Sequence, residues 1–247
     1  MENYEGLAKI YDFMMSGVDY EGWADYVLNV VRRFGCEPRR VLDLACGTGS
    51  TTIPLAQRGV DAVGLDLAPA MLAKARAKAG ALGLNTVFTE MNMLDLTYEK
   101  EFDAVVSFQD GINYLTGEGD FEKLAQGVGR ALKPGGVFLF DLNRVDKYSD
   151  SDTTVVDLED MYLVYENNYD AATRIWHIHL TGFIREGDMY QKFEEIHEEK
   201  NHDYEEVKAA LKAGGMEIAA LWRIFTEEAA ADTDNRVLVV AKKGGKN

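Results

Sequence analysis

Apolar residues recur at two different spacings along this chain, and the spacing changes near residues 36 and 150. In the first 35 residues they form a helical stripe that ends before Gly35, and its members are Trp23, Tyr26, Val27, Val30 and Val31. Short apolar runs then alternate with helical patterns up to about residue 145. The pattern therefore predicts an N-terminal helical segment over 1–35 and an α/β core over 36–145.

Five apolar runs in this core have the length of buried strands. They lie at 40–45, 60–65, 85–90, 102–108 and 137–142, and the helical patterns between them lie at 50–57, 69–82 and 121–132. Pro69 suits the first turn of its helix, and residues 133–136 are predicted to be a turn before the fifth strand. Regular strand–helix alternation is typical of a Rossmann-like, mostly parallel sheet with helices on both faces. Ligands of such sheets bind at the carboxyl ends of the strands.

After residue 145 the apolar positions alternate with period two. Three such segments, at 161–169, 174–184 and 189–197, are separated by short polar turns and predict a three-stranded antiparallel insert within 150–200. A helical pattern at 204–213 ends at Gly214, and strands are predicted at 216–222 and 236–241. The segment 201–247 would complete a seven-stranded sheet, so the whole chain, 1–247, is predicted to be one α/β domain.

Charge and composition exclude several classes of protein. The 247 residues include 42 acidic and 26 basic side chains, a formal net charge of −16, which disfavours binding to phosphate backbones and therefore to nucleic acid. No apolar run is long enough to span a membrane, and the N-terminus does not resemble a signal peptide. Cys36 and Cys46 cannot form a disulfide framework. These features predict a cytoplasmic protein.

The segment DLACGTGS, residues 43–50, carries the clearest chemistry in the sequence. A predicted strand leads into a glycine turn, and a helix follows at once. Gly47 and Gly49 lack a Cβ, so the backbone can approach a ligand closely there. The N-terminus of the next helix offers free N–H groups to an anion. A tight structural turn is the alternative interpretation of the same residues.

Two acidic residues help to choose the ligand. The dinucleotide pattern G-x-G-x-x-G is incomplete, because Thr52 stands where its third glycine would be. Asp43, before the turn, would sit badly beside a pyrophosphate but well beside an ammonium group, and S-adenosylmethionine carries both an ammonium and a carboxylate. Asp66 ends the second strand, where it can accept hydrogen bonds from ribose hydroxyls. Nicotinamide cofactor sites share such an acid, so Asp66 alone does not discriminate.

Four motifs in order resemble the class I S-adenosylmethionine-dependent methyltransferases, and within them the bacterial small-molecule branch. The motifs are DLACGTGS, VGLDLAPAML, FDAVVSFQDGINYL and LKPGGVFLFDLN. The resemblance is strong over about residues 4–143 and looser beyond. It implies S-adenosyl-L-methionine as cofactor and a small molecule as substrate.

The resemblance also implies roles for single residues. The methionine portion of the cofactor would be held by Asp43, Ala45, Gly47 and Gly49, the ribose by Asp66, and the adenine by Leu67 and Met71. Tyr4 and Tyr11 match positions at which similar proteins close a flap over the cofactor. Gln109 would lie between the cofactor and the substrate.

The segment Met91-Asn92-Met93 departs from the pattern of this branch. Gly-Asp-Met is usual there, and its acid accepts a hydrogen bond from the adenine amino group. Asn92 stands in that place, and its amide oxygen can accept the same bond. Asn92 and Met93 are therefore expected to contact the adenine, with weaker affinity than an acid would provide.

Candidate catalytic residues follow the fourth strand. Methyl transfer mainly requires alignment of the nucleophile and exclusion of water, and a base is needed only when the nucleophile arrives protonated. Asp110, Asn113 and Tyr114 come directly after the strand whose end is expected to face the methyl group. Loop capping by Asp110 and simple packing of Tyr114 are the alternatives.

Other polar and aromatic groups suggest less. His177 and His179 share one face of a strand, but no third ligand accompanies them, so no metal site is expected. Cys46 has no neighbouring base in the sequence. The acidic run 194–206 is interpreted as a solvated surface. Aromatic residues of the insert would roof a substrate pocket or form the face of a homodimer; they are Tyr162, Tyr165, Tyr169 and Trp176.

The sequence favours methyl transfer to a nitrogen, oxygen or carbon of a small molecule. Three alternatives stay open: a non-catalytic regulator that binds the cofactor, a protein methyltransferase, and a nicotinamide-dependent oxidoreductase. Asn92 keeps the first open, while Asp43 and the missing third glycine disfavour the last.

Overall fold

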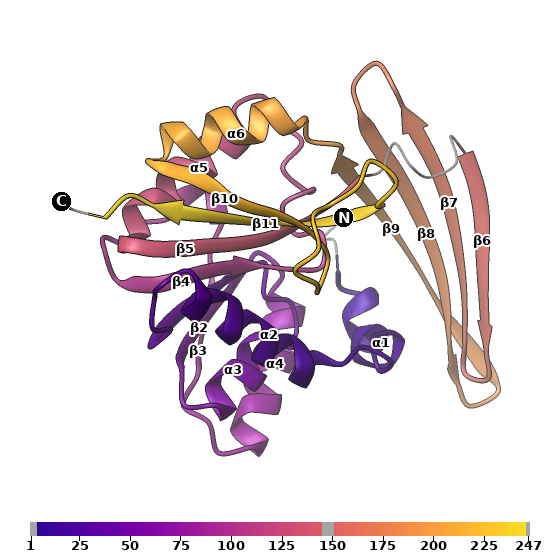
Figure 1. The fold of residues 1–247 in the computed structure, drawn as a ribbon. Helices are drawn as coiled ribbons and strands as arrows, with labels where there is room; N and C mark the ends of the chain where they lie inside the picture. The colour runs from indigo at the N-terminus through magenta and orange to yellow at the C-terminus, as the bar shows by residue number, and fades with distance from the viewer. Residues whose placement is uncertain (1–3, 145–150, 246–247) are drawn as a thin grey trace.

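The computed structural model describes residues 4–144 and 151–245, and they form two separate sheets (Figure 1). The larger sheet has seven strands in the order β10-β11-β5-β4-β1-β2-β3. Its strands are β1 (Arg40–Leu44), β2 (Asp61–Asp66), β3 (Val87–Glu90), β4 (Phe102–Ser107), β5 (Leu132–Asn143), β10 (Met216–Arg223) and β11 (Arg236–Lys243). This confirms the predicted Rossmann-like seven-stranded sheet.

The strand order reverses beside β1. β1 pairs in parallel with β2 on one side and with β4 on the other, and β2–β3 and β4–β5 are parallel too. β11 alone runs antiparallel to its two neighbours, β5 and β10. The chain therefore leaves β1 and β4 in opposite directions, which opens a crevice at their carboxyl ends.

Helices cover both faces of this sheet. α5 (Asp120–Ala131) and α6 (Tyr204–Ala213) lie on one face, and α2 (Tyr20–Arg33), α3 (Thr52–Gln57) and α4 (Pro69–Ala81) on the other (Figure 1). Phe138 and Phe140 of β5 pack with the first group, whereas Val137 and Leu139 pack with α2. All four are fully buried, so each contributes about 1.5–3 kcal/mol of hydrophobic stabilisation.

The structure corrects two predicted boundaries in the core. β5 begins at Leu132, and the segment 133–136 belongs to the strand as an irregularity between the pairs Phe102↔Leu132 and Ala104↔Val137. Gly135 has a φ of +81° there, which permits the bulge. The N-terminal helical segment is divided into α1 (Leu7–Met14) and α2, and the Asp19 carboxylate caps α2 by accepting from the N–H of Gly22.

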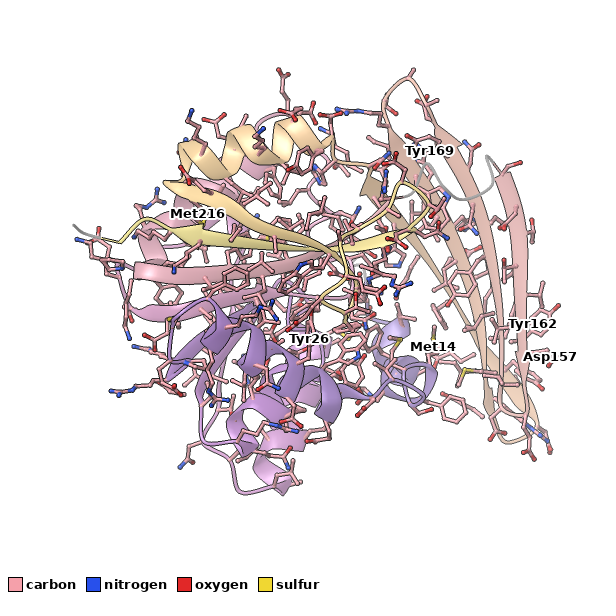
Figure 2. All side chains as sticks on the ribbon, viewed as in Figure 1. Met14, Tyr26, Asp157, Tyr162, Tyr169 and Met216 are labelled. Atoms are coloured by element: carbon pink, nitrogen blue, oxygen red, sulfur yellow. The ribbon has the colours of Figure 1, made fainter. Side chains whose placement is uncertain are left out.

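The insert contains four strands rather than the predicted three. β6 (Ser151–Leu158), β7 (Met161–Asp170), β8 (Ile175–Glu186) and β9 (Met189–Lys200) form one antiparallel sheet in chain order. β6 was missed because it is an edge strand with mostly exposed, polar side chains, so no buried face marks it in the sequence. Figure 2 shows Tyr162 on the outer side of this sheet, in agreement with its 38% exposure.

Helix α1 lies between the insert and the core. Leu7 and Ile10 pack against the inner face of the insert, on Met161, Leu163 and Leu180. The opposite side of α1 packs on Ala68 and Met71 of the core through Ala8. Figure 2 shows Met14, from the end of α1, in the space between the two sheets. None of the helices within residues 4–144 and 151–245 is both long and apolar enough to cross a membrane.

Two helical glycines should respond to alanine in opposite ways. At Gly129 in α5 an added Cβ would collide with the backbone carbonyl oxygen of Gly214, whereas at Gly80 in α4 it would meet nothing. Gly80→Ala should stabilise the fold by up to about 1 kcal/mol through helix propensity. Gly129→Ala should destabilise it by about 1–3 kcal/mol, because backbone must move. Urea unfolding of both variants checks this, and equal shifts would contradict the close packing of α5 on α6.

Candidate functional site

A cavity of about 140 Å³ opens at the carboxyl ends of β1, β2 and β4, beside α1. Ten residues predicted from the sequence line it: Tyr4, Tyr11, Ala45, Gly47, Asp66, Leu67, Met71, Met93, Gln109 and Tyr114. Leu65, Met91 and Gly111 also line it and were not predicted, although each is adjacent in the sequence to a predicted residue.

The carboxylate of Asp66 holds the glycine turn in place. Its Oδ2 accepts the N–H of Gly47 at 2.8 Å, and its Oδ1 accepts the N–H of Ala68 at 2.8 Å. Burial raises the pKa of Asp66, although the two N–H groups oppose that shift. Each carboxylate oxygen keeps a further acceptor site. Asp66 can therefore accept hydroxyl hydrogens from a ligand while it still anchors the turn.

The two glycines of the turn have different functions. A Cβ at Gly47 would meet no protein atom within 4 Å, so the backbone there is open to the cavity, with φ at +53°. At Gly49 a Cβ would press against Phe88 and Ala75, so this glycine allows close packing and does not line the cavity. Ala45, with φ at +52°, adopts a left-handed conformation that is unusual without glycine and typical of functional sites.

Asp43 lies behind the turn instead of on the cavity wall. Its side chain is 2% exposed, and Thr52 Oγ1 donates to its Oδ2 at 2.5 Å. Burial raises the pKa of Asp43 to about 7, although the Thr52 hydrogen bond opposes this shift. The predicted contact between Asp43 and the cofactor amine stays a prediction.

Two predicted asparagines also lie outside the cavity lining. Asn92 Oδ1 accepts the N–H of Leu94 and so begins the short 3-10 helix η1 (Met93–Asp95). Asn113 is fully buried, and its Nδ2 donates to the backbone carbonyls of Asn143 and Lys200 at 2.9 and 3.0 Å. Asn113 thereby joins the core to β9, a structural position for a residue predicted to be catalytic.

The loop after β4 is strained where it meets the cavity. Gln109 and Asp110 have φ values of +59° and +56°, and such consecutive left-handed residues persist only where the surroundings hold them. The Asp110 carboxylate forms an ion pair with Arg236 at 3.3 Å, and Arg236 also contacts Asp141. Burial raises the pKa of Asp110, and the Arg236 guanidinium opposes this rise. Gln109 and Gly111 on either side of Asp110 line the cavity, whereas Asp110 itself does not.

Tyr114 lies on the cavity wall and also contacts a residue of the insert. Its hydroxyl lies 3.3 Å from Nδ1 of His197 in β9, and Nε2 of His197 lies 3.1 Å from the Glu195 carboxylate. Glu195, His197 and Glu199 are all buried, so the interpretation of 194–206 as a solvated surface was wrong for these three. The three residues are spaced two apart in the sequence, which places them on one face of a strand. The sequence alone does not show which face of that strand is buried.

The other two histidines of the insert, His177 and His179, form ion pairs with glutamates. His177 pairs with Glu198 at 3.0 Å and His179 with Glu166 at 3.3 Å, all with partly exposed side chains. Within residues 4–144 and 151–245, no group of three or more metal-binding side chains is placed to hold an ion.

The raised pKa of Asp43 predicts a pH dependence of stability. Between about pH 4 and pH 7 the folded chain holds a proton on Asp43 that the unfolded chain lacks. The resulting stabilisation is present in full below pH 4 and decreases as the pH rises through 7. Relative to Asp43→Asn, the wild-type free energy of unfolding should fall by about 1.4 kcal/mol per pH unit over this range. Urea titrations across it test this, and parallel curves would contradict it.

Comparison with known proteins agrees with the geometry of the site. The methyltransferase domain family matches residues 41–136. A protein of Geobacillus sp. (strain WCH70) that is named as a methyltransferase is 32% identical over 246 residues, or 97% of this chain and 99% of the relative. The crystal structure of an S-adenosylmethionine-dependent methyltransferase from Clostridium acetobutylicum ATCC 824 has a TM-score of 0.88 at 28% identity, over 98% of this chain and 99% of that chain.

A further solved structure is that of the sugar N-methyltransferase KedS8 from Streptoalloteichus sp. ATCC 53650. It has a TM-score of 0.78 at 25% identity and covers 96% of this chain and 92% of its own. The fold, the glycine turn and these relatives all favour a methyltransferase over a nicotinamide-dependent oxidoreductase. The chain belongs to the class I S-adenosylmethionine-dependent methyltransferases.

Proposed function

We propose that this enzyme methylates a small molecule in the cavity between the glycine turn, α1 and the loop after β4. The observation that carries this proposal is the cavity itself, which Tyr4 and Tyr11 cover from the N-terminal side and Tyr114 borders from the core. Such a covered cavity suits a metabolite better than a folded protein. The likeness to a sugar N-methyltransferase over nearly the whole chain supports the same substrate class.

The residues of the cavity fit S-adenosylmethionine. The open backbone at Gly47 suits the methionine portion, the Asp66 carboxylate suits two ribose hydroxyls, and the apolar side chains of Leu67 and Met71 suit the adenine. When bound, the cofactor supplies a methyl group on a sulfonium sulfur, which is displaced in line by a nucleophile. The protein has to align that nucleophile and keep water away.

The cover over the cavity is suited to excluding water. α1 is apolar on the side that meets the insert and on the side that meets the core. The rings of Tyr4 and Tyr11 extend this cover over the cavity. Burial raises the pKa of both phenols far above their usual value, so both remain neutral around pH 7. Neutral phenols can orient a polar substrate by hydrogen bonds without adding charge.

Calorimetry with S-adenosylhomocysteine tests the cofactor site. The wild type should bind one equivalent, and Asp66→Asn should bind about 10- to 100-fold more weakly, because hydrogen bonds to a charged group contribute about 1.5–3 kcal/mol. Asp61→Asn is the matched control at the other, exposed end of β2, and its affinity should equal that of the wild type. Equal affinities of wild type and Asp66→Asn would contradict the assignment of the ribose site.

A screen of acceptors tests the substrate class. The release of S-adenosylhomocysteine should rise with a small amine, alcohol or carbon acid and not with unfolded or folded protein substrates. Turnover that depends only on added protein would overturn the small-molecule assignment. Cofactor binding without turnover on any acceptor class would favour a regulator that binds the cofactor.

A further inference from the structure

Three polar side chains form a chain from the interior of the insert to the cavity. Tyr114, on the loop after β4, lines the cavity, and its hydroxyl contacts Nδ1 of His197 at 3.3 Å. Nε2 of that imidazole contacts Oε2 of Glu195 at 3.1 Å. Glu195 and His197 are 3% and 4% exposed, so only Tyr114 of the three reaches the cavity.

The surroundings of Glu195 favour its ionised form. Its Oε1 accepts the N–H groups of Gly6 and Leu7, both at 2.9 Å, in addition to the contact of Oε2 with His197. Burial alone would raise the pKa of Glu195, but the hydrogen bonds from His197 and the backbone outweigh it, and the pKa is lowered. An ionised carboxylate can only accept hydrogen bonds. Nε2 of His197 must therefore carry the proton.

This tautomer determines the direction of the next hydrogen bond. In the neutral imidazole a proton on Nε2 leaves Nδ1 as the acceptor, and the Tyr114 hydroxyl then donates to it. Burial raises the pKa of Tyr114 well above its usual value, so it stays a neutral phenol. The Tyr4 hydroxyl donates a hydrogen bond to the Tyr114 oxygen, and the second lone pair of that oxygen can accept a proton from the cavity.

We propose that Tyr114, His197 and Glu195 form a proton relay that takes up the proton released by the substrate during methyl transfer. This inference rests on the proposed function, and it adds a proton path of which the sequence marked only Tyr114. It also restricts the substrate to an acceptor that carries a hydrogen on its nucleophilic atom, an amine or a hydroxyl.

The relay balances charge and protons at each atom. The lone pair of the acceptor's nitrogen or oxygen forms the new bond to the methyl carbon, and the electrons of the broken carbon–sulfur bond stay on sulfur. The proton of the acceptor then passes to the Tyr114 oxygen while the phenolic proton passes to Nδ1 of His197. The imidazolium that results lies beside the Glu195 carboxylate, which stabilises it. After the product has left, the Nδ1 proton returns to the Tyr114 oxygen while the phenolic proton passes into the cavity, which restores the starting state.

Other polar groups lie close to the relay and need to be separated from it. The ring of Tyr4 lies 4.9 Å from that of His197 and 6.1 Å from that of Tyr114. Glu199 follows on the same face of β9, and burial together with Asp110 raises its pKa to about 8. In its ionised form Glu199 is the competing proton acceptor, and substitution of Glu199 and His197 separately distinguishes the two.

The first test reads the tautomer in the protein without a substrate. Nitrogen-15 spectra of histidine-labelled protein should show His197 with its proton on Nε2. In Tyr114→Phe the Nδ1 resonance should shift, because it loses its hydrogen-bond donor, while His177 on the exposed face of β8 should not change. A proton on Nδ1 of His197 in the wild type would overturn the relay, whatever the enzyme methylates.

The second test uses the acceptor that gives the fastest release of S-adenosylhomocysteine. His197→Gln should lower kcat about 10²-fold, in the range of general-base catalysis, while the Kd of S-adenosylhomocysteine changes less than about 3-fold. Tyr114→Phe should lower kcat to a similar degree, and the double variant should be no slower than either single one, because the residues act as a unit. Glu195→Gln, which keeps the shape of the side chain, should also lower kcat.

The controls distinguish a failed relay from a failed function. His177→Gln, which alters a surface ion pair with Glu198, should retain wild-type kcat. The relay would be overturned if the reductions in kcat of the two single variants multiplied in the double variant. It would also be overturned if only Glu199→Gln lowered kcat, provided that cofactor binding and turnover persist in the wild type. Absence of cofactor binding in the wild type would instead refute the proposed function. The nitrogen-15 measurement would still test the hydrogen bonds between Tyr114, His197 and Glu195.

Discussion

The parallel pairing of β1 with both β2 and β4 is the constraint on which the site depends. It brings three strand ends, with Ala45, Asp66 and Gln109 after or at them, to one edge of the sheet. The Asp66 carboxylate then holds the glycine turn of β1 through the N–H of Gly47. The single carboxylate of Asp66 thus holds the floor of the cavity and offers its remaining acceptor sites to the ligand.

The cover of the cavity depends on contacts between segments far apart in the chain. α1 is too short to be stable alone, and it is held by the apolar inner face of the insert and by the core beneath it. Glu195 of β9 accepts the first N–H groups of α1, which have no partner within the helix. The insert therefore holds both the N-terminal helix and the polar chain that ends at Tyr114.

Asn113 and Asp110 show how neighbouring residues acquire different functions. The side-chain amide of Asn113 hydrogen-bonds with the backbone of Asn143 and Lys200, and Asn113 therefore connects the insert to the core. Asp110 is held in a left-handed conformation and pairs with Arg236, a residue of the last strand. Nothing local in the sequence distinguishes these positions from Tyr114, since the partners lie about 30 to 125 residues away.

Local patterns were sufficient for the features that local physics controls. Strand–helix alternation predicted the fold. The glycine turn and Asp66 at the end of β2 predicted the cofactor and most of the cavity lining. Burial periodicity and backbone freedom are properties of short segments, so the sequence shows them directly. The tertiary structure decided the rest. It added the polar edge strand β6 and buried Glu195 and His197 beside Tyr114. Five of the predicted site residues lie outside the cavity lining: Asp43, Gly49, Asn92, Asp110 and Asn113. Which face of a strand is buried depends on what packs against it, and that is settled only when distant segments meet.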